Sequence, residues 1–128
     1  MTQSSATISS VTELAASLAL TIDGQAVAGA AAPLTVVNPA TEAVLAHAPA
    51  ADTAQLDEAI ASARTAFAVW RTRPWEDRRN LVLAYADALE AHAEDLARLL
   101  TAEQGKPLAA ARGEVARAVE WEIGRAHV

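Results

Sequence analysis

The hydrophobic period of this chain changes once, near Asp52, and the change divides the sequence into a strand part and a helix part. Before Asp52, short β-branched runs alternate with turn residues, and after it apolar residues recur every three or four positions as far as Trp121. Alternation is typical of half-buried strands, and recurrence at three and four positions is typical of amphipathic helices. We therefore expect a small antiparallel β meander over residues 20–48, followed by three to four helices over residues 52–121.

The clearest strand signal is a hairpin at the start of the meander. Two short apolar runs, residues 20–22 and 25–27, flank Asp23 and Gly24. An Asp-Gly pair between alternating apolar residues is a strong signal for a two-residue hairpin turn. We expect a loose loop over residues 29–33 after this hairpin.

Two further strands are expected on either side of a turn at Asn38 and Pro39. The β-branched run over residues 34–37 stops there, because Pro39 biases Asn38 away from helix and cannot donate to a sheet ladder. Residues 43–48 read as the last strand, and we expect Pro49 to end it. Together with the hairpin, these runs complete the predicted meander.

The first helix is expected to begin at Asp52. Its carboxylate can cap the helix, and Gln55 stands three residues later, as in a capping box. Apolar residues then recur at three and four positions, which predicts one buried stripe. The stripe consists of Leu56, Ala59, Ile60, Ala63, Phe67 and Trp70.

Breaks divide the rest of the helix part. We expect the second helix to open at Pro74 and to be interrupted near His92, where the apolar spacing stretches. Gly105 can take the left-handed conformation that closes a helix, and Pro107 suits the first position of the next one. The predicted buried faces are Leu81, Tyr85, Ala88, Leu89, Leu96, Leu99 and Leu100 before Gly105, and Leu108, Ala111, Val115, Ala118 and Val119 after it.

Composition excludes several classes of protein. The net charge of −6 argues against a nucleic-acid binder, which needs a basic face. No run of about 18 apolar residues exists that could span a membrane. Much of the 52% hydrophobic content is alanine, so we expect closely packed helices around a thin core. Residues 1–19 contain no Lys or Arg, unlike a secretory signal, and their Ser- and Thr-rich start predicts a disordered leader.

The sequence contains no pattern typical of a metal or phosphate site. The histidines lie on different predicted elements without metal-ligand spacing, so we interpret them as surface or core residues. They are His47, His92 and His127. The glycines form no phosphate-binding pattern. With no cysteine, the chain also lacks a thiolate nucleophile and a disulfide, which is compatible with the reducing cytoplasm, where we expect the protein.

The charged and aromatic residues have structural interpretations. A local basic cluster, interrupted by acidic residues, is interpreted as a solvated helix start rather than an anion site. Its members are Arg71, Arg73, Arg78 and Arg79. Glu94 and Asp95 are adjacent, so they point to different sides of a helix and do not form an acid–base pair. The tryptophans are expected to be packing anchors: Trp70, Trp75 and Trp121. These residues therefore predict no catalytic, cofactor-binding or metal-binding site.

Five segments between Leu20 and Trp121 resemble, in order, the start of the NAD(P)-dependent aldehyde dehydrogenase superfamily. Each motif is weak by itself, but five in register are specific. The segments are IDGQAV, VVNPATEAVLAHAPA, the helix over residues 56–70, PWEDRR, and EQGKPL with ARGEV. The chain is therefore similar to the opening part of the family's coenzyme-binding domain. Its EQGKP motif resembles in particular the members that oxidise semialdehydes.

The resemblance implies an α/β enzyme with a Rossmann-like coenzyme domain, a catalytic domain and a bridging arm for homo-oligomerisation. In the family a cysteine thiolate attacks the aldehyde, hydride passes to NAD or NADP, and water activated by a glutamate releases a carboxylic acid. These groups and the coenzyme-binding turn lie downstream in the family, and none has a counterpart here. Some members hold a monovalent cation near the positions of Val36 and Val37, but its other ligands fall beyond this chain. The resemblance thus implies an N-terminal fragment that lacks the Rossmann-like core, binds no coenzyme or metal, and is inactive as it stands.

A rival interpretation comes from another class of protein. The same residues could form a self-contained helical module, derived from such a fragment, that binds a partner protein through an exposed apolar face. An intact natural stop after a polar C-terminal cap would favour this module, whereas continuation into a nucleotide-binding strand would favour the fragment.

Residues 122–128, EIGRAHV, are expected to be a non-native tail. The aromatic-rich run that follows the tryptophan in the family is missing, and Gly124 lowers helix propensity. The tail also matches the translation of a common sequencing adapter, read as GAG ATC GGA AGA GCA CAC GTC before a stop. We therefore expect the natural sequence to end at Trp121 or within the codon of Glu122.

Overall fold

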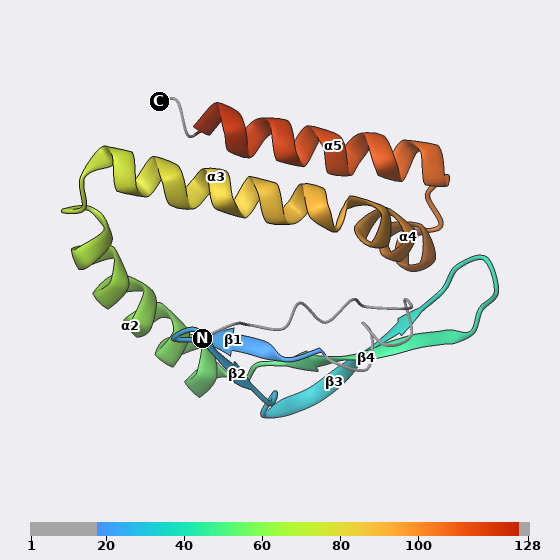
Figure 1. Ribbon diagram of the computed structural model, residues 1–128. Coiled ribbons are helices and arrows are strands. Elements are labelled where there is room, and N and C mark those ends of the chain that lie inside the picture. The colour runs from blue at the N-terminus through green and yellow to red at the C-terminus, as the bar shows by residue number, and fades with distance from the viewer. Residues whose placement is uncertain (1–17, 126–128) are drawn as a thin grey trace, which may run out of the picture.

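The computed structural model describes residues 18–125, and its elements follow the predicted order of strands before helices. Two antiparallel strand pairs lie on one side, α3 and α5 run side by side on the other, and α2 joins the two parts at one end (Figure 1). Most of the expected leader and His127 lie outside the described residues. None of the helices within residues 18–125 is long and apolar enough to cross a membrane.

The first strand pair is the predicted hairpin. Strand β1 (Leu20–Ile22) pairs antiparallel with β2 (Gln25–Val27). The two turn residues, Asp23 and Gly24, have φ angles of 52° and 72°. Positive φ at both central residues is the geometry that the Asp-Gly sequence favours, because it matches the twist of the flanking strands.

The second strand pair is longer than predicted. Strand β3 (Ala31–Val37) pairs with β4 (Val44–Ala50), so the expected loop over residues 29–33 and the expected end at Pro49 are both wrong. The register shifts between the pairs Ala31 with Ala50 and Leu34 with Ala48. This irregularity accommodates Pro33 and Pro49, because neither proline has to donate to the ladder at a bulge.

The two strand pairs form separate sheets rather than a continuous meander. The loop between them is held by a side chain instead: Gln55 accepts from the Ala30 amide and donates to the Ala28 carbonyl, both at 2.8 Å. Gly29 passes so close to Ala50 that a Cβ atom there would lie 2.5 Å from its carbonyl oxygen. The Ala28 carbonyl and the Ala30 amide therefore bond Gln55 rather than a neighbouring strand.

Helix α2 (Thr53–Trp70) begins at the predicted residue but has only half of the predicted capping box. The carboxylate of Asp52 accepts from the Gln55 amide at 2.8 Å, as expected. The Gln55 side chain does not reach back, because it bonds the loop at residues 28–30. The cap of α2 thus also fixes where the helix lies against the strands.

The other helices break at the predicted residues. Helices α3 (Trp75–Ala91) and α4 (Ala93–Gln104) meet at His92, which has a non-helical φ of −107°. Gly105 closes α4 in the left-handed conformation, with φ 69°. Helix α5 (Leu108–Arg125) follows Pro107, whose carbonyl accepts from the first-turn amides.

The core consists mainly of alanines where α5 packs against α3 and α4. Ala86, Ala97 and Ala111 are at most 1% exposed, and Val119 is also buried. Ile22 is buried in the first hairpin. Among residues 18–125 no large side chain is completely buried. Alanine lets helices approach closely but buries little area, so the core is thin, as predicted.

The predicted buried faces are partly wrong. Four of the predicted leucines are partly buried as expected: Leu89, Leu96, Leu99 and Leu100. The predicted residues that are exposed instead are Leu81, Tyr85, Ala88 and Ala118. On α3 the buried residue is Ala86, whereas its neighbour Tyr85 is exposed. On α2 the partly buried positions are Gln55, Ala59 and Ser62, so most of the predicted stripe faces solvent.

The tryptophans are not packing anchors within this chain. Trp121 is 70% exposed, and Trp70 and Trp75 are exposed as well. Trp75 instead lies under the guanidinium of Arg79, whose Cζ atom is 5.7 Å from the ring centroid.

We predict that Gly105→Ala lowers the midpoint of thermal unfolding, followed by circular dichroism. A left-handed backbone costs an alanine about 1–2 kcal/mol. The new Cβ would also lie 2.9 Å from Cγ of Pro39. The same change in a Pro39→Ala background is the control, since it keeps the strain and relieves the contact. An unchanged midpoint for Gly105→Ala would contradict the prediction.

We also predict that the isolated chain binds apolar dyes, self-associates and melts over a broad range. Fourteen large hydrophobic side chains are exposed in the described part of the chain, more than isolated surface residues explain. Dye fluorescence, sedimentation and calorimetry measure the three properties. A sharp two-state transition of a monomer would contradict this prediction and favour the self-contained interaction module.

Candidate functional site

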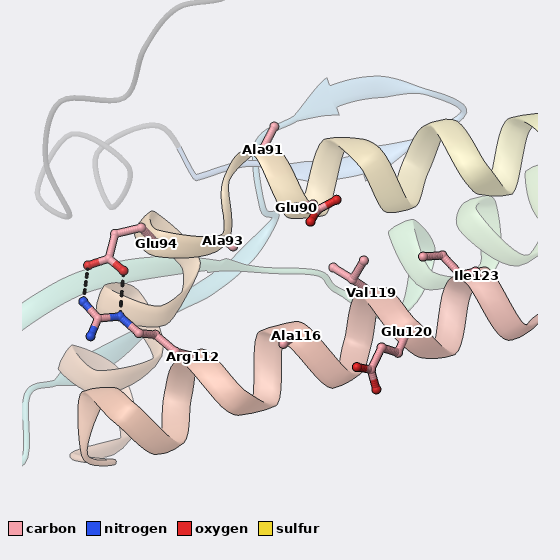
Figure 2. Close-up of a pocket in the computed structure, with 9 residues that line it drawn as sticks. All are labelled: Glu90, Ala91, Ala93, Glu94, Arg112, Ala116, Val119, Glu120 and Ile123. Carbon is pink, nitrogen blue, oxygen red and sulfur yellow. Dashed lines mark hydrogen bonds and ion pairs between the residues drawn. The ribbon is translucent and has the colours of Figure 1, made fainter.

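A groove of about 610 Å³ lies between α3, the start of α4 and α5 (Figure 2). Its floor is apolar and its polar groups are three carboxylates and one guanidinium. The lining residues are Glu90, Ala91, Ala93, Glu94, Arg112, Ala116, Val119, Glu120 and Ile123. None of these carries a hydroxyl, thiol, imidazole or amine, so the only side chains in the lining that could take part in chemistry are the three carboxylates and the guanidinium.

A bidentate ion pair lies at one end of the groove. Arg112 on α5 donates from Nε and Nη2 to the two carboxylate oxygens of Glu94 on α4, each at 2.8 Å (Figure 2). Arg98 adds a second contact to Glu94 at 2.9 Å. Paired hydrogen bonds from a guanidinium fix both distance and orientation, so they hold α4 and α5 in register.

The ion pair makes Glu94 a poor proton carrier. The hydrogen bond from Arg112 lowers the pKa of Glu94 from 4.5 to about 2. The same bond raises the pKa of Arg112. Both groups are therefore charged and occupied near neutral pH, which suits a structural link rather than general acid–base catalysis.

A second ion pair closes the turn between α4 and α5. Lys106, directly after the Gly105 break, contacts the carboxylate of Glu114. This hydrogen bond lowers the pKa of Glu114. The EQGKPL and ARGEV segments noted in the sequence thus meet in space, and their charged residues join the two helices.

The histidines do not come together. His47 lies on β4, with Nδ1 3.4 Å from the hydroxyl of Thr35 on the paired strand. His92 lies at the break between α3 and α4. Within residues 18–125 no group of histidine, aspartate and glutamate side chains could hold a metal ion.

The basic cluster is dispersed around the turn between α2 and α3. Arg71 is the C-cap of α2, Arg73 lies in the turn, and Arg79 stacks on Trp75. Arg78 donates its backbone amide to the carbonyl of Pro74 in the first turn of α3. Arg71 and Arg73 are exposed, whereas Arg78 and Arg79 are half-buried, so the expected solvated helix start holds for only part of the cluster.

Two contacts of the structure have little signal in the sequence. Glu94 and Arg112 are 18 positions apart and lie on different helices. The only local indication is the spacing of Glu94 and Arg98, which is typical of a pair on one helix. Gln55 reaches a loop 25 to 27 residues away, although its spacing from Asp52 predicts a capping box.

Comparison with known proteins places most of the chain in one family. A sequence model of the aldehyde dehydrogenase family matches residues 26–122. A probable aldehyde dehydrogenase from Pseudomonas sp is 48% identical over 102 residues, which are 80% of this chain and 21% of that protein. Malonate-semialdehyde dehydrogenase 2 from Shouchella clausii is 40% identical over 100 residues, 77% of this chain and 21% of that protein.

Solved structures match the fold over the same part. Betaine aldehyde dehydrogenase from Staphylococcus aureus, in complex with NAD+, superposes with a TM-score of 0.83 and 29% identity, covering 91% of this chain and 24% of that one. An aldehyde dehydrogenase from Brucella melitensis biovar abortus superposes with a TM-score of 0.81 and 32% identity, covering 84% and 22%. The chain therefore spans about a fifth of the length of the curated relatives that it matches.

We predict that the ion pair between Glu94 and Arg112 makes stability fall in acid. The folded pKa of Glu94, about 2, lies below its ordinary value of 4.5. The contribution of the pair is therefore complete above pH 4.5 and is lost as the pH falls towards 2. Melting midpoints measured across this range should fall more steeply for the wild type than for Glu94→Gln.

The control for this measurement is Glu90→Gln. Glu90 lines the same groove but makes no ion pair among residues 18–125. Its substitution should leave the acid-induced fall unchanged. Parallel curves for the wild type and Glu94→Gln would show that the pair does not contribute.

Proposed function

The chain belongs to the aldehyde dehydrogenase family, and we propose that it is the N-terminal segment of an enzyme that oxidises an aldehyde to a carboxylic acid with NAD+ or NADP+. The observation that carries the proposal is the match of the family over residues 26–122. The superposition on the Staphylococcus aureus enzyme, over 91% of this chain, supports it independently. The longer protein would be a homo-oligomer, as the resemblance implies, and the absence of cysteine from this segment is compatible with the cytoplasm, where we place it.

The role of this segment is structural rather than chemical. The chain has no cysteine, so a thiolate nucleophile has to come from the remaining four fifths of the protein. The groove between α3 and α5 has no thiol in its lining, and its Glu94 is bonded to Arg112. The ion pairs and caps support a scaffold that orients the elements of a larger enzyme.

The residues of this segment do not fit a dinucleotide. A coenzyme pyrophosphate binds free amides at a glycine-rich turn between a strand and a helix. In the described part of the chain only α2 follows a strand directly, and Asp52 occupies its N-terminus. A carboxylate there repels a pyrophosphate and already bonds the Gln55 amide. NAD+ or NADP+ would therefore be held by other parts of the enzyme.

The substrate would be a semialdehyde, an aldehyde that also carries a carboxylate. The EQGKP motif supports this class of substrate, and so does the similarity to malonate-semialdehyde dehydrogenase 2. Recognition of the substrate carboxylate would require a cationic group in the remaining part of the protein, because Arg112 is already bonded to Glu94.

We predict that the purified chain has no dehydrogenase activity. It supplies neither the thiolate for covalent catalysis nor a turn for the coenzyme. The assay follows formation of reduced nicotinamide from NAD+ or NADP+ with a panel of aldehydes and semialdehydes. The full-length Pseudomonas relative is the positive control, and turnover by the chain above the buffer blank would contradict the prediction.

A further inference from the structure

Helix α2 is held in place by polar contacts on one face. Gln55 bonds the backbone at Ala28 and Ala30, and the hydroxyl of Ser62 donates to the carboxylate of Asp23 at 3.0 Å. Residues seven apart lie on the same side of a helix, so these contacts come from one face. Together with Ala59, the contacting residues Gln55 and Ser62 are the only partly buried positions of α2.

A different face of α2 carries large apolar side chains that none of residues 18–125 buries. Leu56 and Phe67 are 54% and 61% exposed, and Ile60 and Trp70 are exposed as well. No residue of α2 is buried. We call these four residues the α2 stripe. Hydrogen bonds thus orient the helix, while its apolar stripe is not buried against any described part of the chain.

The comparisons indicate what covers the stripe. The arrangement of these elements recurs in the Staphylococcus aureus enzyme with a TM-score of 0.83, although this chain covers only 24% of that one. The same conformation therefore exists inside a much longer chain. A helix that is oriented by polar bonds and keeps an exposed apolar stripe suits an α/β domain, in which helices cover the faces of a sheet.

We propose that the α2 stripe is the surface through which this segment docks on an apolar face of the remaining part of the same enzyme. The inference rests on the proposed function, because it takes the remaining aldehyde dehydrogenase chain as the occupant. Phe67, whose side chain is the most exposed of the four, would be the main contact. The polar face with Gln55 and Ser62 would set the angle at which the stripe is presented.

The test is a chimera built on the Pseudomonas relative. Its 102 matched residues are replaced by the matching segment of this chain, either unchanged or with Phe67→Asp. We expect the unchanged chimera to be folded and active. Burial of Phe67 predicts that Phe67→Asp lowers the melting temperature, at a fixed scan rate, by roughly 5–10 °C.

Val69→Asp is the matched control. Val69 is 63% exposed on α2. It lies seven residues after Ser62 and therefore on the face away from the stripe, but its side chain makes none of the hydrogen bonds of that face. Both substitutions introduce the same residue near the end of the same helix. In the isolated chain neither should change the helical content, because both positions are exposed there. In the chimera Val69→Asp should leave the melting temperature close to that of the unchanged protein.

Three results would overturn docking through the stripe. They are an unchanged melting temperature for Phe67→Asp, an equal fall for Val69→Asp, and an unchanged chimera that does not fold. A folded chimera that is sensitive to Phe67→Asp but has no dehydrogenase activity would support docking and contradict the proposed function. The two proposals therefore fail separately.

Discussion

The close approach of α5 to α3 and α4 holds the helical part of this structure together. It depends on three alanines, Ala86, Ala97 and Ala111, which are almost completely buried. A methyl group lets two helix backbones come near each other, but it removes little apolar area from water. The large side chains consequently remain outside this contact, and the chain forms a thin core with wide apolar surfaces.

Polar contacts fix the relative positions of the helices, which the thin core alone does not specify. Arg112 donates hydrogen bonds to both carboxylate oxygens of Glu94 and so fixes α5 on α4. Gln55 bonds α2 to the loop after the first hairpin. Such contacts specify geometry even where they add little stability, because exposed ion pairs are individually weak. This combination suits a segment that presents its elements to a larger domain, which is the role we propose within an aldehyde dehydrogenase.

The features that could be predicted from the sequence are those that one or two neighbouring residues decide. The Asp23 and Gly24 turn and the left-handed Gly105 lie where expected, and the helix breaks as predicted at His92. The prediction was wrong at Pro49, because a proline is tolerated inside a strand when the partner strand bulges opposite it. The bond between Glu94 and Arg112 was not predicted, since it joins two helices whose packing is not a local property.

The sequence by itself determined where the helices start and stop and where the first hairpin turns, and its motifs identified the family that the comparisons confirm. Limits on φ, missing amides at prolines and the period of apolar residues act within a few positions, so they can be read directly. Only the tertiary structure decided which faces are buried. On α3, Ala86 is buried and Tyr85 is exposed. On α2, Phe67 is exposed while Ser62 bonds the hairpin. The physical reason is that burial depends on the size and position of the neighbouring element, which no single segment encodes.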